Sequence, residues 1–318
     1  MFAEAFKTTA SAVAQILLLG AIGYFLKKRN ILSDAGLDGL SHLVIDVTLP
    51  ILIFVQLIKD FNFKVYPDWW VFPLLSIGIT ALALIVGIIF IGFIRDGQKR
   101  LQFLSLVTFQ NSGYLPLAMF VALLPAYKAG AMLIYLFLFL IGFNLVMWPL
   151  AVYILSFSKR AKFEFHNLLN PPVIAAILGV VVVFLGWDRL IPGLAVKPLK
   201  LAGDCTLPLA MFVVGADLAK IKIGHFDRNA MSWMVLAKLI VLPALGLWLV
   251  LKLRLPELTG LLILLQLAVP PATSLSVIAR HYKKEDLIIS QGIFFGHILS
   301  IITIPVFLSL YFAWAMIR

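Results

Sequence analysis

The pentapeptide DVTLP at residues 46–50 returns as DCTLP at residues 204–208, about half a chain length later in a sequence of 318 residues. Each copy interrupts a long apolar run with an aspartate and a proline. A proline breaks the hydrogen-bond ladder of a helix, and a buried carboxylate is costly unless it has partners. Repetition of so unfavourable a phrase predicts two structurally related halves.

The composition places the chain in a membrane. Hydrophobic residues make up 62% of the chain and charged residues 13%, with a mean hydropathy of +1.05. Soluble domains are nearer one quarter charged. We therefore expect the lipid bilayer as the main partner, and we attribute the net charge of +11 to cationic loops rather than to nucleic-acid binding. The single cysteine, Cys205, excludes an internal disulfide.

Apolar runs long enough to cross a bilayer follow one another along the chain, since a spanning helix needs about 20 apolar residues. They predict an all-α polytopic membrane protein with ten transmembrane helices. The expected spans are 8–26, 37–58, 69–94, 101–123, 129–157, 170–187, 198–219, 229–251, 258–279 and 286–316. The connections between them are short, and none would fold as a soluble domain.

The loop charges predict the orientation. Loops after odd-numbered helices carry fifteen of the 26 Lys and Arg residues, three in each loop, whereas the other face carries ten. Because cationic loops stay in the cytoplasm, both termini are expected outside. We expect a multi-pass protein of the plasma membrane, the inner membrane in a bacterium.

The repeated phrase falls in the second and the seventh predicted helix, so the repeat unit is five helices. Residues 1–157 form the first repeat, 158–169 a short cytoplasmic linker, and 170–318 the second repeat. LLLGAIGYFLKK (17–28) and AILGVVVVFLGW (176–187) are a second matching pair. An odd number of helices per repeat inverts the second copy, an arrangement typical of secondary transporters.

The fourth and ninth predicted helices are both broken near their middle, by QNSGYLP (110–116) and AVPPATS (268–274). Backbone freed by such breaks must be buried in protein or line a cavity. Paired breaks in two halves indicate a substrate site, and the N-terminal ends of half-helices suit an anion such as a carboxylate. The predicted substrate-binding residues are Asn111, Ser112, Gly113, Tyr114, Pro116, Pro270, Pro271 and Thr273.

The repeated phrase is a second candidate site. Each copy would gather a carboxylate, a carbonyl freed by proline and a threonine hydroxyl within one turn, a set that suits a hard cation or a proton. Lys238, inside the eighth span, would pair with one of the acids, balance an anionic substrate or snorkel to the surface. The candidates for ion or proton coupling are Asp46, Thr48, Asp204, Thr206 and Lys238; a structural role as helix cap or lysine partner is the alternative for both acids.

The chain has no signature of an enzyme. Its five histidines, at 42, 166, 225, 281 and 297, lack metal-ligand spacing, and clustered acidic metal motifs are missing. We expect no catalytic residue, no metal and no cofactor beyond a proton or sodium gradient. A channel is the remaining alternative, which single-channel conductance would distinguish from a carrier.

Four stretches resemble the auxin efflux carrier family: residues 18–54, NPPVIAAILG (170–179), GDCTLPLAMFVVGADLA (203–219) and QLAVPPATSLSVIARHY (266–282). The resemblance implies a fold of two inverted five-helix repeats, shared with bile-acid symporters, in which the fourth and ninth helices cross at the substrate site. It also implies a transport domain of helices 3–5 and 8–10, and a scaffold of helices 1, 2, 6 and 7 that often forms a homodimer.

Family members are carriers of carboxylates, dicarboxylates in bacteria and auxin in plants. Asn111 matches the first crossover asparagine of the plant carriers, but the second crossing reads PPAT without one. The long central loop of plant members is missing, which favours a short-loop prokaryotic type. The acidic pair of the related sodium–proton antiporters is absent too. We expect a secondary carrier of small organic anions that works by alternating access; the alternative is a sodium-coupled symporter of the bile-acid type.

Overall fold

The computed structural model describes residues 2–156, 169–221, 227–281 and 287–315. Within these ranges the chain is helical, apart from connecting turns and one isolated β-bridge. Seven helical segments are long and apolar enough to cross a membrane, and three shorter apolar helices accompany them. The predicted linker 158–169 lies outside the described residues except for its last residue.

Among its described residues, 2–156, the first half of the chain has seven α-helices and one π-helical segment. They are α1 (Phe2–Lys28), α2 (Asp34–His42), η1 (Leu43–Thr48), α3 (Leu49–Asp60), α4 (Val71–Ile91), α5 (Gly97–Thr108), α6 (Tyr114–Leu123) and α7 (Ala126–Ser156). Between α5 and α6 the chain leaves the helix at the predicted QNSGYLP break.

The second half repeats much of this order. Its elements are α8 (Pro171–Phe184), η3 (Trp187–Leu190), α9 (Gly193–Asp204), α10 (Thr206–Lys220), α11 (Arg228–Val235), η4 (Leu236–Val241), α12 (Leu242–Leu253), α13 (Glu257–Ala268), α14 (Ser274–His281) and α15 (Leu287–Ala315). The chain is extended between α13 and α14, at the predicted AVPPATS break.

Helix is found within each of the ten predicted ranges, but prolines divide several of them. Pro50 follows the π-helical η1, and Pro243 follows the π-helical η4. At Pro208 the helix is broken at Cys205 instead. A proline lacks the N–H that an α-helix requires four residues after each carbonyl, and a π-type turn is one way to absorb that loss.

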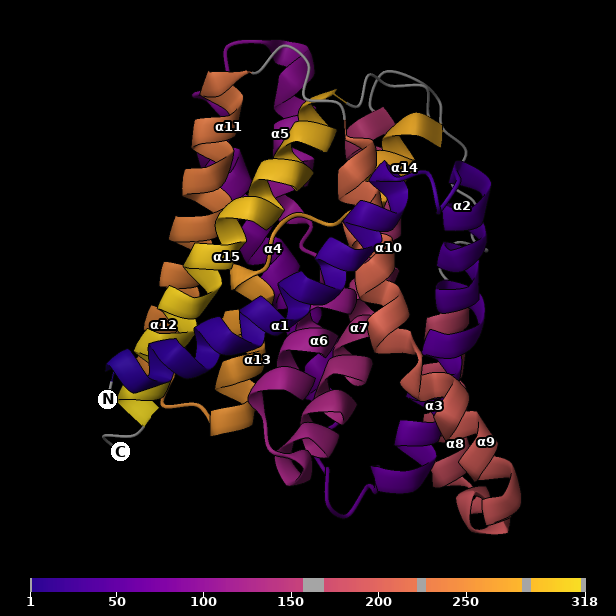
Figure 1. The fold of residues 1–318 in the computed structure, drawn as a ribbon. Helices are drawn as coiled ribbons and strands as arrows, with labels where there is room; N and C mark the ends of the chain where they lie inside the picture. The colour runs from indigo at the N-terminus through magenta and orange to yellow at the C-terminus, as the bar shows by residue number, and fades with distance from the viewer. Residues whose placement is uncertain (1, 157–168, 222–226, 282–286, 316–318) are drawn as a thin grey trace.

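The packing of α1 joins the two halves. It lies across the front of the molecule in Figure 1, against α10 and α15, and the two ends of the chain lie near each other. A Cβ atom at Gly23 would clash with the carbonyl of Phe212, and one at Gly215 with the carbonyl of Gly20. Small residues at such contacts let helix backbones approach closely, as in membrane helix pairs.

Candidate functional site

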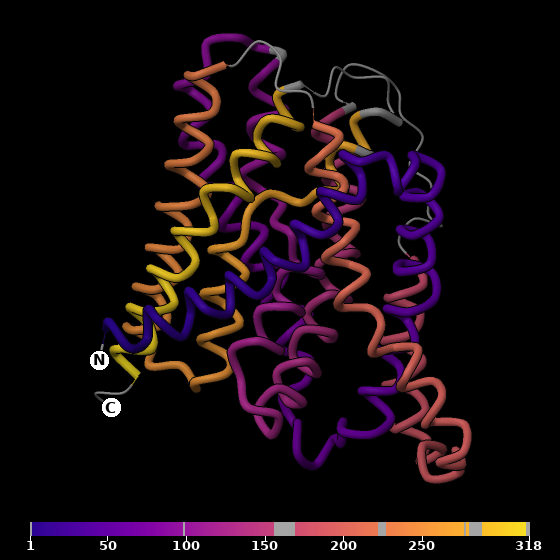
Figure 2. The backbone as a smooth tube through the Cα atoms, in the orientation of Figure 1, coloured from indigo at the N-terminus to yellow at the C-terminus, as the bar shows by residue number. Residues whose placement is uncertain are grey.

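The two interruptions cross each other in the middle of the fold. The Asn111 N–H donates to the Pro270 carbonyl at 2.9 Å, and the Ala272 N–H donates to the Phe109 carbonyl at 3.0 Å. These bonds form an antiparallel bridge centred on Gln110 and Pro271. Figure 2 shows the extended segment before α14 passing through the centre of the molecule. Neither segment could satisfy this backbone alone, so each break requires the other.

Four half-helix ends converge on this crossing. The helices α5 and α13 end there with their C-termini, and α6 and α14 begin there with their N-termini. Gly113 occupies the N-cap of α6 without a side-chain hydrogen bond to the helix. The free N–H groups at a helix start carry a partial positive charge and attract anions. Pro116 lies in the first turn of α6. Its missing N–H does not weaken the helix there, because the N–H groups of a first turn have no partner within the helix.

Polar side chains are concentrated around the crossing, and several lack partners. Gln266 donates through Nε2 to the carbonyl of Ser112, which precedes α6, at 3.2 Å. The Thr108 hydroxyl, both amide atoms of Gln110, the Ser112 hydroxyl and Gln266 Oε1 are buried without a hydrogen-bond partner among the described residues. Buried polar groups are normally paired, so this cluster indicates a place for water or a ligand.

Lys238 reaches the same region from η4. Its side chain is fully buried, and its Nζ donates to the Val107 carbonyl at 3.2 Å, in the last turn of α5. The predicted pairing with Asp46 or Asp204 is wrong, and so is snorkelling, because the side chain does not reach the surface. A cation near the negative C-terminal end of a helix is stabilised there.

Asn111 connects the crossing to α15. Its Nδ2 lies 3.3 Å from Nε2 of His297, whose other ring nitrogen, Nδ1, lies 2.8 Å from the Ile293 carbonyl. Asn111 and His297 are both buried. Thr273 and Tyr114 are half-buried and flank the crossing, Thr273 just before α14 and Tyr114 as the first residue of α6. The structure therefore gathers all eight residues predicted for the substrate site at one place.

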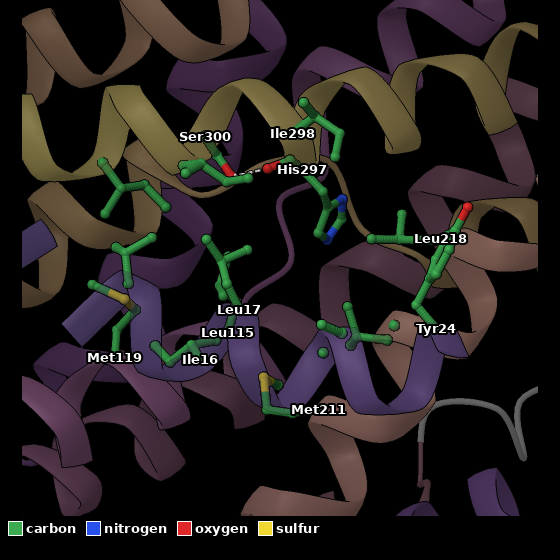
Figure 3. Close-up of a pocket in the computed structure, with 17 residues that line it drawn as sticks. Ile16, Leu17, Tyr24, Leu115, Met119, Met211, Leu218, His297, Ile298 and Ser300 are labelled. Carbon is green, nitrogen blue, oxygen red and sulfur yellow. Dashed lines mark hydrogen bonds between the residues drawn. The ribbon is translucent and has the colours of Figure 1, made fainter. Parts of the chain in front are cut away.

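An apolar cavity of about 290 Å³ lies beside the crossing, between α1, α6, α10 and α15 (Figure 3). Aliphatic and methionine side chains form most of its wall, including Ile16, Leu17, Met119 and Met211. His297 projects from α15 toward α1 in Figure 3 and gives the wall one of its few polar groups. Through His297 the cavity is linked to Asn111.

The structure does not form the predicted oxygen cluster at DVTLP and DCTLP. Asp46 is half-exposed and lies 2.8 Å from His42, and Asp204 is half-exposed and lies 2.6 Å from Lys200. Thr48 and Thr206 are buried instead. Residues two apart on a helix face different directions, which separates each carboxylate from its threonine. Each acid finds a basic residue one helical turn earlier.

Sequence reasoning missed four residues of the site or gave them little weight: Thr108, Gln110, Gln266 and His297. Gln110 is the first letter of the quoted QNSGYLP, and Gln266 stands four residues before Pro270, where a carbonyl is freed. Their positions beside the two breaks could have marked Gln110 and Gln266 as site residues. Nothing in the sequence links His297 to Asn111, which is 186 residues away.

No group of three or more His, Cys, Asp or Glu side chains that would hold a metal occurs among the described residues.

At the end of the bundle, Lys99 of α5 donates a hydrogen bond to Asp227, the residue before α11, at 2.7 Å. Burial raises the pKa of Asp227, but hydrogen bonds from the Ala230 N–H and from Lys99 outweigh it and hold that pKa below its usual value.

Comparison with known families agrees with this architecture. A family model described as membrane transport protein matches residues 8–167 and 160–308, nearly the whole chain. No curated protein matches the chain. The match and the apolar helices make the chain a multi-pass membrane transporter rather than an enzyme. By this match, the chain belongs to the auxin efflux carrier family of membrane transport proteins.

Proposed function

We propose that this protein is a secondary transporter of small organic anions, which it carries across the plasma membrane by alternating access. The observation that carries the proposal is the crossing of the two broken helices, where buried polar atoms of Gln110, Ser112 and Gln266 find no hydrogen-bond partner in the part of the chain that the structure describes. Half-helix N-termini lie at the same place. Gln110 Nε2, the Ser112 hydroxyl and the half-helix N-termini can donate to a carboxylate, and the amide oxygens of Gln110 and Gln266 can accept from water or from a hydroxyl of the substrate.

Lys238 strengthens the preference for an anion. Among the described residues its polar contact is the Val107 carbonyl, and no described carboxylate forms an ion pair with it. A buried ammonium without a counter-ion is unfavourable by several kcal/mol. A carboxylate bound at the crossing would supply the missing negative charge.

The neighbouring cavity suggests the shape of the substrate. Its wall is aliphatic except near His297, Ser300 and Tyr24. Ligand sites usually combine an apolar pocket with a few polar groups that fix orientation. An anion with one carboxylate and an apolar body would place the carboxylate at the crossing and the body in the cavity. A dicarboxylate would leave its second charge against apolar side chains.

Alternating access requires two bodies that move against each other, and the packing supports an assignment. Helix α1 of the first half packs on α10 of the second half, and α8 of the second half packs on α3 of the first half. Exchanging the two halves therefore turns one pair into the other. This symmetry supports ten spans in two inverted repeats. We assign α1, α2, α3, α8, α9 and α10 to the scaffold, and the remaining helices to the moving transport domain.

Uptake into proteoliposomes tests the proposal. Radiolabelled phenylacetate and malonate would be offered to the purified protein, with and without a sodium gradient, so that the sodium-coupled alternative is tested together with substrate shape. Saturable uptake of phenylacetate, independent of sodium, is the expected result. The absence of saturable carboxylate uptake would overturn the proposal.

Two serines on the same broken helix provide a matched pair of variants. Ser112→Ala removes an unpartnered hydroxyl at the crossing, and we expect uptake to fall at least tenfold. Ser105→Ala removes a buried hydroxyl that donates to the Leu101 carbonyl within α5. It should leave uptake near the wild-type rate. Equal effects of the two variants would place the anion elsewhere.

A further inference from the structure

His297 is a buried imidazole whose hydrogen bonds define its protonation state. The Ile293 carbonyl can only accept a hydrogen bond, so Nδ1, 2.8 Å away, carries a proton. In the neutral ring Nε2 then has a lone pair, which accepts from Nδ2 of Asn111 at 3.3 Å. The structure therefore describes a neutral ring with one free site for a proton, beside the substrate-site residue Asn111.

We propose that His297 binds the proton that accompanies the transported carboxylate, an inference that rests on the proposed function. When Nε2 takes up a proton from water, it changes from an acceptor into a charged donor. The hydrogen bond from Asn111 is lost, because two donors now face each other. The step forms the Nε2–H bond and breaks one O–H bond of a hydronium ion, which leaves as water.

The protonated pair fits a carboxylate. Nε2 of His297 and Nδ2 of Asn111, which lie 3.3 Å apart, would each donate to one carboxylate oxygen, and the imidazolium makes one of these bonds charge-assisted. The carboxylate thereby accepts hydrogen bonds from both groups, which can no longer bond to each other once His297 is protonated. Because linkage is reciprocal, the proton strengthens carboxylate binding and the carboxylate strengthens proton binding by the same factor.

His297 also has a route to its ligands, because its side chain lines the 290 Å³ cavity. Tyr24 of α1 is the other titratable side chain among the described residues that line this cavity; Tyr114 of α6, Asp217 of α10 and Lys238 of η4 belong to neighbouring elements. The polar partners of the His297 ring are Asn111 and Ile293. Its proton balance is therefore set by the crossing itself.

The acids of the repeated phrase are poorer candidates for this role. Asp46 and Asp204 each pair with a base on the same helix, His42 and Lys200. Their carboxylates are half-exposed, whereas the ring of His297 is buried. An exposed ion pair of this kind contributes little to stability.

Calorimetry tests the coupling directly. Binding of acetate, phenylacetate, indole-3-acetate, malonate and malate would be measured in two buffers of different ionisation enthalpy, which gives the number of protons taken up per anion bound. We expect about one proton for wild type. In the pH range where the empty site is neutral and the occupied site charged, the Kd should rise about tenfold per pH unit.

His297→Gln keeps a hydrogen-bonding side chain without a titratable ring, and should bind with no proton uptake and a Kd that does not change with pH. His42→Gln removes the exposed histidine and should behave as wild type. If His297→Gln does not fold, histidine ¹⁵N NMR spectra of the wild-type protein show directly whether His297 takes up a proton when the anion binds. They should show Nδ1–H alone in the empty protein and a doubly protonated ring with phenylacetate.

Two failures are distinguishable. If none of the five anions binds, the proposed function falls, and this inference with it. If an anion binds to wild type without proton uptake, or if His297→Gln keeps full proton uptake, the assignment of the proton to His297 is wrong and the proposed function stands.

Discussion

Replacing Lys238 with methionine should stabilise the empty protein while it impairs transport. The change removes a buried charge and keeps an unbranched side chain of similar length. Lys238 is fully buried, and the Val107 carbonyl, 3.2 Å from Nζ, is its polar contact. Because the described acids do not pair with it, the substitution leaves no orphaned carboxylate behind.

The magnitude follows from opposing contributions. Burial of an ammonium costs several kcal/mol. A charged hydrogen bond to a carbonyl returns about 1.5–3 kcal/mol, and the C-terminal end of α5 returns up to about 1 kcal/mol more. The remaining cost is about 1–3 kcal/mol, so Lys238→Met should raise the melting temperature by about 1.5–4.5 °C in a chain of this size. Removal of the charge should weaken anion binding by about 2 kcal/mol or more, a loss of roughly 30-fold.

Thermal unfolding in detergent, followed by tryptophan fluorescence, measures the first effect, and proteoliposome uptake the second. Lys200→Met is the matched control, because Lys200 is half-exposed and pairs with Asp204 on its own helix. It should change stability by no more than about 1 kcal/mol. A Lys238→Met protein that melts several degrees lower but transports normally would refute the reasoning and make Lys238 a structural cap of α5.

Three further changes test other parts of the structure. Gly215→Val should separate α1 from α10, since a Cβ atom there clashes with the Gly20 carbonyl; we expect a loss of at least 2 kcal/mol, seen as a lower melting temperature, and an unchanged value would contradict the packing. Asp227→Asn should make the stability of the protein less sensitive to acid. Because the pKa of Asp227 is lowered in the folded state, its contribution to stability is complete above about pH 4 and is lost as the pH falls further. Melting curves from pH 3 to 6 measure this. Leu17→Trp should obstruct the cavity and reduce phenylacetate uptake, whereas Leu18→Trp, at a position 67% exposed, should not; equal uptake would exclude the cavity from the substrate path.

The breaks in the fourth and ninth spans could be predicted because their cause is local. Proline removes an N–H wherever it stands, and Gly113 and Ser112 are poor helix residues in any context. The ion pairs of Asp46 and Asp204 could also have been predicted, since His42 and Lys200 each stand four residues earlier, at the i,i+4 spacing of helical ion pairs. The burial of Lys238 and the contact of His297 with Asn111 could not be predicted, because both depend on helices distant in sequence coming together.

The crossing also has a consequence for how the chain is made. The backbone groups of Phe109 and Asn111 find their partners on Pro270 and Ala272, roughly 160 residues later. At a synthesis rate of about 5–20 residues per second, the wait is about 8–32 s. Throughout this interval the first broken helix holds polar backbone that lipid cannot satisfy. The nascent first half must therefore be sheltered, by water or by the insertion machinery, until the ribosome has delivered its counterpart.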